Sequence, residues 1–359
     1  MSIKLQDFVK NTNGIFTLGG KPFRFVGANV YELANLESGI TKSIIEDSAE
    51  AGFTALRFWL FENKPIQAQI DKLNEICGAV NSFGIKLIIS LADKWGYLQN
   101  YKIDEAWYNG GYRNEYLRYV KAVTGEFKER PEIMIWELIN EPETDHFNVF
   151  YDFAKVVSGE IKSVNGNHLL SIGTVGGVGD KFGSYFSVFN KKNFRKLYSL
   201  DTLDAVSLHD YSYDSGIFER LDILYRFKGE LKKAERYSKL GNSIEKPFAG
   251  IDGYFLKKGK LFRFPLTLRW IWNIYNSRDV SFAERIGKPV YIGETGFKNI
   301  PGRDRVKIMD LDITEKFNAG VGGIMLWSFE AQGWNKDGHD YGFGLGEGFE
   351  EAVKKWNVF

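Results

Sequence analysis

The chain has 359 residues, of which 44% are hydrophobic and 26% charged, a balance typical of a globular protein. Lys and Arg total 47 against 46 Asp and Glu, so the formal net charge is +1. This near-neutrality gives no electrostatic reason to expect a nucleic acid or an anionic membrane as a partner.

The sequence shows neither of the apolar segments expected of a secreted or membrane-spanning protein. The first residues, MSIKLQDFVK, contain no long apolar segment of the kind found in signal peptides. No stretch approaches the roughly 18 apolar residues of a membrane span. The single cysteine, Cys77, excludes an intrachain disulfide and is expected to be a buried, inert thiol. We therefore expect a cytoplasmic protein, although a secreted chain whose leader had been removed would have the same sequence.

In chain order, a small hairpin is expected first, over Asn13–Lys21, capping the bottom of the fold. Eight short apolar segments follow and are expected to be strands: Phe23–Asn29, Thr54–Leu60, Lys86–Ala92, Ile133–Leu138, Leu169–Gly173, Ala205–His209, Pro289–Gly293 and Gly323–Phe329. Helical patterns separate most of them, over Ser43–Ala51, Pro65–Phe83, Asn114–Arg130 and Phe147–Asn165. Strands that alternate with helices indicate a parallel sheet. Eight such units predict a closed (β/α)8 barrel, with residues 1–359 forming one domain.

The spacing of the strands is regular except between the sixth and the seventh. Residues 210–288 are too many for one crossover, and they are expected to hold a helix (Ile217–Leu240), an irregular segment (Gly241–Phe264) and another helix (Pro265–Phe282). We interpret this segment as an insertion that shapes the active-site face, where the loops of barrels vary most.

Two of the predicted strands end in a glutamate. The fourth strand, Ile133–Leu138, reads IMIWEL and is followed closely by Asn140 and Glu141, and the seventh reads PVYIG and leads into Glu294. An unbroken apolar run suits a strand that is buried on both faces of a parallel sheet. Because the carboxyl ends of barrel strands converge on one opening, the sequence predicts a site with two carboxylates.

Polar and aromatic side chains stand at the other strand ends. They are Asn29, Tyr31, Arg57, Asp93, Trp95, Trp136, Asn140, His209, Tyr211 and Trp327. Two carboxylates among such groups suit cleavage of a glycosidic bond, in which one glutamic acid protonates the leaving oxygen and the other, ionised, attacks the anomeric carbon or activates water. Arg57 is expected to hold the second glutamate ionised, and Asn140 to donate to a sugar hydroxyl.

Each of these residues also has a plainer interpretation. Either glutamate alone would be a solvated or salt-bridged surface group, an interpretation that weakens when both are taken with the strand order. Arg57 would then pair with a structural carboxylate, His209 would be a core histidine and Trp327 would pack the barrel. Glu137, inside the fourth strand, is expected to be structural.

No cofactor is expected. The loop Gly173–Gly179 lacks the G-x-G-x-x-G spacing and the Lys-Ser/Thr ending of phosphate-binding loops, so we interpret it as an active-site loop. The four histidines, His146, His168, His209 and His339, show no metal-ligand spacing, so no metal is expected either.

These motifs resemble those of glycoside hydrolase family 5 in clan A, whose members are retaining (β/α)8 glycosidases with Asn-Glu-Pro at the end of the fourth strand and Glu at the end of the seventh. Here the motifs stand as Asn140-Glu141-Pro142 and as Gly293-Glu294-Thr295. The resemblance covers essentially the whole barrel. It implies that Glu141 is the acid/base and Glu294 the nucleophile. The residues expected to contact the substrate are Arg57, Trp95, Asn140, His209, Tyr211 and Trp327.

Within this family the chain is most similar to the branch that acts on β-mannans. Gly27–Tyr31 and Leu91–Trp95 carry this similarity, although mannanases usually end the third strand in Asn-Asn-Trp, where this chain has Asp93-Lys94-Trp95. The resemblance implies retaining cleavage of β-1,4-mannosidic bonds in mannan or manno-oligosaccharides. The alternatives are a β-1,4-glucanase on the same frame, a carbohydrate-binding barrel without catalysis, and a metal-dependent hydrolase.

Overall fold

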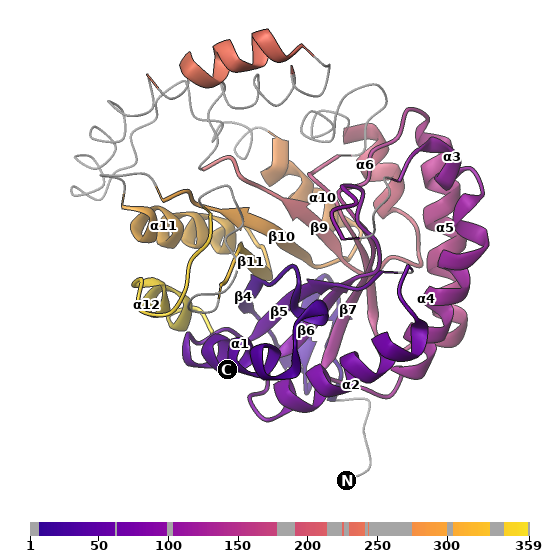
Figure 1. Ribbon diagram of the computed structural model, residues 1–359, viewed down its shortest axis with the longest axis horizontal. Coiled ribbons are helices and arrows are strands. Elements are labelled where there is room, and N and C mark those ends of the chain that lie inside the picture. The colour runs from indigo at the N-terminus through magenta and orange to yellow at the C-terminus, as the bar shows by residue number, and fades with distance from the viewer. Residues whose placement is uncertain are drawn as a thin grey trace.

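Eight parallel strands form the centre of the computed structural model, in the order β8-β7-β6-β5-β4-β11-β10-β9 (Figure 1). The structure describes residues 7–61, 63–98, 103–177, 191–213, 225, 230–240, 243, 275–299, 304–330 and 341–357. The strands are β4 (Phe25–Asn29), β5 (Ala55–Trp59), β6 (Lys86–Ser90), β7 (Ile133–Asn140), β8 (Leu169–Gly173), β9 (Val206–His209), β10 (Val290–Gly296) and β11 (Gly323–Trp327).

Backbone hydrogen bonds join the two outermost strands of this order and bring the sheet round into a barrel. The amide of Asp204, just before β9, donates to Leu170 in β8 over 2.8 Å, and the amide of His209 donates to Thr174, just after β8, over 2.7 Å. The predicted (β/α)8 barrel is confirmed, and each of the eight predicted strands is present. The largest difference is at β10, which runs three residues beyond the predicted end, Gly293, while β7 runs two residues beyond Leu138.

Helices pack around the outside of the strands, as Figure 1 shows. Those in the described residues are α1 (Ser38–Glu50), α2 (Ile66–Asn81), α3 (Glu105–Tyr108), α4 (Glu115–Glu126), α5 (Phe147–Val164), α6 (Lys191–Tyr198), α10 (Ser277–Arg285), α11 (Arg305–Asn318) and α12 (Phe349–Lys354), with 3-10 turns η2 (Leu33–Asn35) and η3 (Gly111–Arg113). In α5, the buried Phe150, Phe153, Val157 and Ile161 recur every three or four residues and form one apolar stripe. The helix α1 begins five residues before the predicted Ser43, because Thr41 is buried and donates to the backbone of Leu33.

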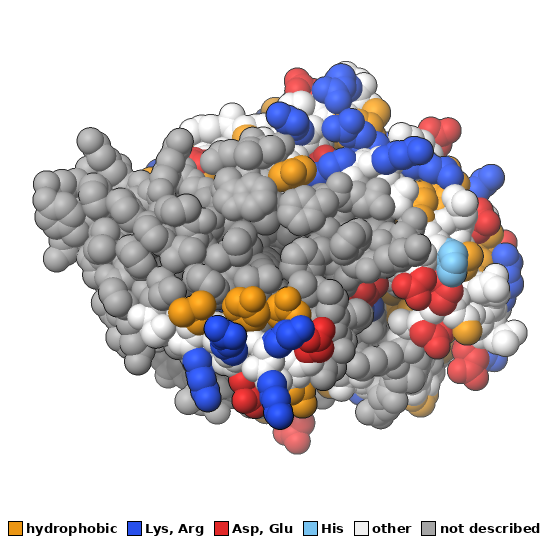
Figure 2. Space-filling model, turned by 90° about the horizontal axis from the view of Figure 1, so that it is seen from above, with side chains coloured by type: hydrophobic (Ala, Val, Ile, Leu, Met, Phe, Trp, Pro, Cys, Tyr) orange, Lys and Arg blue, Asp and Glu red, His pale blue; other side chains and the backbone are white. Residues whose placement is uncertain are grey.

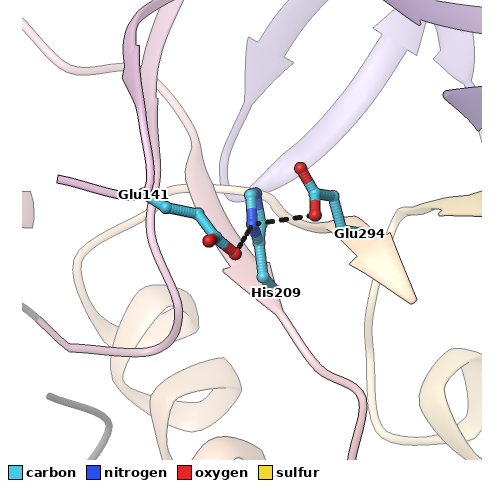
Figure 3. Close-up of side chains that lie close together, drawn as sticks. All are labelled: Glu141, His209 and Glu294. Carbon is cyan, nitrogen blue, oxygen red and sulfur yellow. Dashed lines mark hydrogen bonds and ion pairs between the residues drawn. The ribbon is translucent and has the colours of Figure 1, made fainter. Parts of the chain in front are cut away.

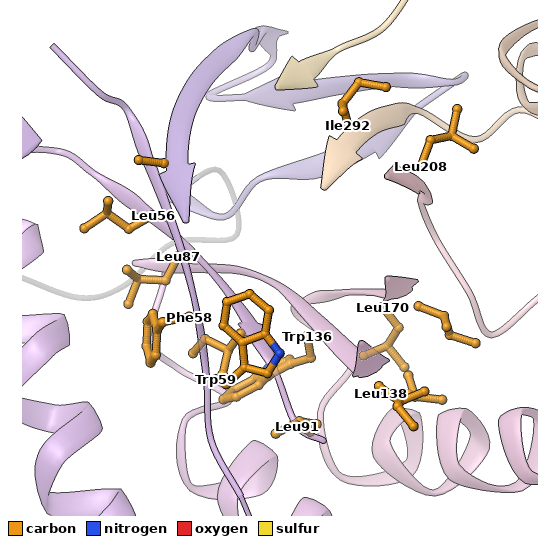
Figure 4. Close-up of a cluster of buried hydrophobic side chains, with 14 of the residues drawn as sticks. Leu56, Phe58, Trp59, Leu87, Leu91, Trp136, Leu138, Leu170, Leu208 and Ile292 are labelled. Carbon is orange, nitrogen blue, oxygen red and sulfur yellow. The ribbon is translucent and has the colours of Figure 1, made fainter. Parts of the chain in front are cut away.

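The main apolar core lies between the strands and these helices. Figure 4 shows part of it, with side chains of β5, β6, β7 and β8 gathered together. The core residues labelled there are all fully buried: Leu56, Phe58, Trp59, Leu87, Leu91, Trp136, Leu138, Leu170, Leu208 and Ile292. Trp136 belongs to this core and donates its indole N–H to Nδ1 of His168 over 3.1 Å. Its placement among the strand-end residues was therefore wrong.

A three-stranded antiparallel sheet precedes the barrel, formed by β1 (Lys10–Thr12), β2 (Ile15–Leu18) and β3 (Lys21–Pro22). It extends further than the predicted hairpin, because Lys10–Thr12 pairs with β2. The Phe16 ring lies 5.5 Å from that of Phe25 at the start of β4 and 6.3 Å from that of Tyr291. The sheet therefore covers the N-terminal end of the barrel, and the site must lie at the other end.

Most of the predicted insertion, residues 210–288, lies outside the described residues. Of the predicted helix Ile217–Leu240, residues 231–240 are helical, and of Pro265–Phe282 the described part enters α10 at Ser277. The role of this insertion stays a prediction.

The surface carries both signs of charge, in keeping with the net charge of +1. Figure 2 shows one face, with Lys and Arg along its upper edge and Asp and Glu gathered at the right. Within the described part of the chain, no helix is both long and apolar enough to cross a bilayer.

Candidate active site

The two predicted glutamates lie together at the C-terminal end of the barrel, on either side of His209 (Figure 3). Nδ1 of His209 lies 2.9 Å from Oε1 of Glu141 and 3.6 Å from Oε2 of Glu294. One oxygen of each carboxylate and one nitrogen of the imidazole all fall within 4.8 Å of one another. Each glutamate is only 5% exposed, so the three groups interact in an environment largely shielded from water.

A bulge in each glutamate-bearing strand places these side chains. Along β7 the pairing with β8 advances by three residues, from Glu137 to Asn140, while β8 advances by two. Along β10 the pairing with β11 makes the same step between Ile292 and Thr295. Because side chains alternate between faces of a strand, one extra residue reverses the alternation beyond it. Residues three apart then face the same side.

Glu141 stands immediately after β7 in a left-handed backbone conformation, with φ of 44°. This conformation is uncommon for a residue other than glycine and marks a strained position. The amide of Glu141 donates to the carbonyl of Gly173 over 2.7 Å, and Trp95 donates its indole N–H to Oε2 of Glu141 over 2.8 Å. Neighbouring strands thus hold both the backbone and the carboxylate.

Glu294 accepts hydrogen bonds from two predicted site residues. Nη1 of Arg57 donates to its Oε1 over 2.8 Å, and the hydroxyl of Tyr211 donates to its Oε2 over 2.9 Å. Arg57 is entirely buried, so its charge is not screened by water. We expected Arg57 to keep Glu294 ionised, and this role requires such a contact.

Arg57 also binds a carboxylate that sequence reasoning had left as structural. Nε and Nη2 donate to Oε2 of Glu137 over 3.0 and 2.7 Å. The other oxygen, Oε1, accepts from the hydroxyl of Tyr291 over 2.6 Å. Neither Glu137 nor Tyr291 was predicted as part of the site. Their spacing, three residues before Asn140 and Glu294, becomes informative only when the bulges are known.

Asn140 is fixed from both sides of its amide. Nη2 of Arg57 donates to its Oδ1 over 2.8 Å, and its Nδ2 donates to Oδ1 of Asp93 over 3.1 Å. Asp93 also accepts from the hydroxyl of Tyr31 over 2.7 Å. Burial raises the pKa of Asp93 to about 6, and these hydrogen bonds oppose the rise.

Burial raises the pKa of both glutamates, but their neighbours separate them. At Glu141 the hydrogen bonds from His209 and Trp95, with the charges on His209 and Lys94, outweigh burial, so its pKa is lowered. At Glu294 the charge of Glu141 adds to burial and outweighs Arg57 and His209, so its pKa is raised. The interactions with His209 are thus the largest of those that favour the ionised form of Glu141.

Comparison with known proteins identifies the family to which the chain belongs. The family model described as cellulase (glycosyl hydrolase family 5) matches residues 17–332. The chain belongs to glycoside hydrolase family 5. It is similar to mannan endo-1,4-beta-mannosidase F of Aspergillus fumigatus, with 29% identity over 249 residues that make up 58% of this chain and 57% of that protein. The chain thus spans little more than half the length of this relative.

Solved structures share the fold across nearly the whole chain. The endo-1,4-beta-mannanase from Rhizomucor miehei superposes with a TM-score of 0.68 at 20% identity, covering 97% of this chain and 98% of that one. Cel5A of Thermotoga maritima, solved in complex with mannotriose, gives a TM-score of 0.58 at 14% identity, covering 98% and 100%. At these identities the likeness shows the (β/α)8 fold alone.

In this family 5 chain, aromatic rings lie beside the glutamates. Trp327, half-buried at the end of β11, has its ring centre 6.2 Å from that of Tyr31 and 5.8 Å from that of Trp59. Tyr97, which is 68% exposed, lies 6.4 Å from Trp95 with the two rings only 14° from parallel. Trp59 is buried beneath them, whereas the other rings offer flat apolar surfaces next to hydrogen-bonding groups, as a sugar requires. Tyr97 was not predicted, because nothing in the sequence distinguishes it from other surface tyrosines.

Two other segments lie only partly within the described structure. Of His339-Asp340-Tyr341, only Tyr341 is described, and its ring lies 5.5 Å from that of Tyr211. Of the loop Gly173–Gly179, residues 173–177 are described. A side-chain carbon on Gly173 would lie 3.0 Å from both Arg57 and Glu137, so these side chains would have to shift to accept any larger residue.

The two glutamates and His209 also form a group of three possible metal ligands, which the spacing of the histidines did not reveal. Glu141, His209 and Glu294 supply two carboxylates and an imidazole. Each carboxylate oxygen of the two glutamates, however, already accepts a hydrogen bond from a protein donor. A metal would have to displace several of these bonds, so the arrangement does not favour metal binding.

Proposed function

We propose that the protein hydrolyses β-1,4-mannosidic bonds in mannan or manno-oligosaccharides with retention of anomeric configuration. The observation that carries this proposal is the close approach of the two buried carboxylates, with oxygens within 4.8 Å. Retaining enzymes hold their carboxyl groups about 5–5.5 Å apart, whereas inverting enzymes leave about 6.5–9.5 Å for a water. The spacing favours direct attack by a glutamate.

Glu294 is the nucleophile in this proposal. Its carboxylate attacks the anomeric carbon, and the glycosidic bond to the leaving sugar breaks as the glycosyl-enzyme bond forms. Arg57 and Tyr211 hold the attacking group in place through their hydrogen bonds. Water then displaces Glu294 and restores the configuration.

Glu141 protonates the leaving oxygen and later accepts a proton from the incoming water. The pair formed by Glu141 and His209 holds the proton for the first step, because the two groups lie 2.9 Å apart. Once Glu141 carries the proton, its negative charge no longer raises the pKa of Glu294. Arg57, which is always charged, then remains to favour the carboxylate of Glu294.

Mannan is proposed as the substrate because the relative from A. fumigatus is a mannan endo-1,4-beta-mannosidase. The second candidate is β-1,4-glucan, which the name of the matching family model, cellulase, favours. A product profile on mannohexaose beside cellohexaose decides between them. Faster cleavage of cellohexaose would overturn the mannan assignment.

Three measurements separate this mechanism from its rivals. We expect Glu141→Gln and Glu294→Ala each to lower turnover by several orders of magnitude, and a carbohydrate-binding barrel would show no turnover in the wild type. NMR of the first product formed is expected to show the β-anomer; an α-anomer would indicate inversion. Treatment with a chelator is expected to leave activity unchanged, whereas a metal-dependent hydrolase would lose it.

A further inference from the structure

Arg57 is shared between two carboxylates, which it contacts through different parts of the guanidinium. The Nε–Nη2 edge donates to Glu137, and Nη1 donates to Glu294. The side chains of Arg57 and Glu137 are 0% exposed, and that of Glu294 is 7% exposed. One buried cation thus serves two buried anions.

Glu137 is fully buried, and both of its carboxylate oxygens accept hydrogen bonds. Its Oε2 accepts from Arg57 twice, and its Oε1 accepts from Tyr291 over 2.6 Å. Tyr291 and Glu294 belong to the same strand, and so do Glu137 and Asn140. A buried charge is costly unless it is paired, and Glu137 pairs with the same guanidinium that contacts Glu294.

We propose that Glu137 is a positioning residue that acts through Arg57. It partly neutralises the guanidinium charge, so that Glu294 remains basic enough to attack. The inference rests on the proposed role of Glu294 as the nucleophile. A cation that faced Glu294 alone would hold the carboxylate too tightly, because nucleophilic reactivity falls with basicity.

The other charged and titratable neighbours do not replace this effect. Glu294 faces Arg57 from β5, His209 and Tyr211 at the end of β9, and Glu141 after β7. Glu137 faces Arg57 and Tyr291, with Tyr198 of α6 further away. Removing the charge of Glu137 takes away an anion near Glu294 and leaves Arg57 to Glu294 alone. Both changes favour the carboxylate of Glu294, so their effects have the same sign.

The test is the pH dependence of kcat/KM for Glu137→Gln, measured on whichever β-linked substrate the wild type cleaves. The acid limb reports protonation of the interacting pair in the free enzyme, in which Glu294 must be ionised and Glu141 protonated for reaction. We expect it to move to lower pH by about one unit and the plateau of kcat to fall by roughly three- to tenfold. A structural role predicts lower thermal stability with the acid limb unmoved, and that result, or an upward shift, overturns the proposal.

Two further variants separate charge from packing. Tyr291→Phe removes the hydrogen bond to Glu137 but keeps both charges, so the acid limb is expected to stay near that of the wild type. If it moves as far as in Glu137→Gln, charge is not the cause. Glu137→Asp keeps the buried anion but retracts it from Arg57, so a smaller downward shift is expected. Should Glu137→Gln fail to fold, an unmoved acid limb in Glu137→Asp overturns the proposal.

A measurement without substrate keeps this test separate from the proposed function. NMR titration of protein carrying carboxyl-13C glutamate follows Glu294 directly, with its resonance assigned by its loss in Glu294→Gln. The same downward shift is expected in Glu137→Gln. A wild type that cleaves no glycoside would end the proposed function, whereas an unmoved Glu294 resonance would end this inference.

Discussion

The indole of Trp95 donates a hydrogen bond of 2.8 Å to Oε2 of Glu141, while His209 binds the other oxygen of the same carboxylate. Trp95 also lies beneath the ammonium group of Lys94, which is 4.0 Å from the ring centre. Trp95 therefore links the side chain expected to transfer the proton to the aromatic surface expected to bind the sugar.

We predict that Trp95→Phe shifts the basic limb of kcat/KM to higher pH and lowers kcat by roughly tenfold. The indole hydrogen bond lowers the pKa of Glu141, so its loss makes Glu141 a weaker acid. The decrease should be larger for an oligosaccharide than for an aryl glycoside whose leaving group needs no protonation. Tyr97→Phe is the control, since it alters a neighbouring ring without touching this bond. An unmoved basic limb would contradict the prediction.

Arg57→Lys is predicted to lower the free energy of unfolding by about 3–5 kcal/mol, because an ammonium cannot satisfy both buried carboxylates. It is also predicted to lower kcat/KM by at least roughly a hundredfold, since Glu294 loses its fixed partner. Urea unfolding and steady-state kinetics measure the two effects. The control Arg130→Lys alters a partly exposed pair with Glu132 at 3.3 Å and should change stability by less than about 1 kcal/mol. Equal effects of the two variants would show that burial of Arg57 is unimportant.

Asp93→Asn should become more stable relative to the wild type as pH rises. The pKa of Asp93 is raised to about 6 in the folded protein, above its unfolded value of about 3.9. The native state therefore binds more protons between these values, and its stability falls as pH rises from about 4 to about 6. Asparagine removes this titration, a difference of up to about 3 kcal/mol. Unfolding measured at pH 4 and pH 7 tests it, and an equal stability difference at both would refute it.

Gly173→Ala is expected to destabilise the protein by about 1–3 kcal/mol and to reduce kcat. The added carbon would lie 3.0 Å from Nη2 of Arg57 and from Oε2 of Glu137, pressing apart the ion pair beneath Glu294. The control is Gly166→Ala, where an added carbon would meet nothing within 4 Å. Differential scanning calorimetry compares the two variants. A Gly173→Ala protein as stable as the control would contradict the prediction, because it would show that Arg57 and Glu137 can shift at little cost.

The barrel was predictable because its signals are local. Each strand is a short apolar run, and helix periodicity separates the runs, so the order of β4 to β11 follows from the sequence. The positions of Glu141 and Glu294 followed from the same reasoning, since a residue after a barrel strand lies at the mouth. The network around Arg57 was not predictable in this way. Contacts among Arg57, Glu137 and Tyr291 join three strands that are far apart in the chain.

The alternation of side chains also misled the sequence reasoning. Both β7 and β10 were predicted to stop where their bulges begin, because the expected pattern is lost at that point. Asn140 and Glu294 consequently seemed to follow their strands, whereas they lie within them. A bulge leaves no clear sign in one sequence, so only the structure assigns Glu137 and Asn140 to one face.

Because of the bulges, the site also depends on the number of residues in β7 and β10. Deleting Ile139 or Gly293 would restore regular pairing with the neighbouring strands, which tends to improve the hydrogen bonding of a sheet. The same deletion would turn every residue beyond it to the opposite face, removing Asn140 or Glu294 from the mouth while the apolar pattern below stayed intact. Such a shortened protein would be a well-formed barrel without a working site. Scanning by substitution would never reach this outcome, because no exchange of side chains alters the length of a strand.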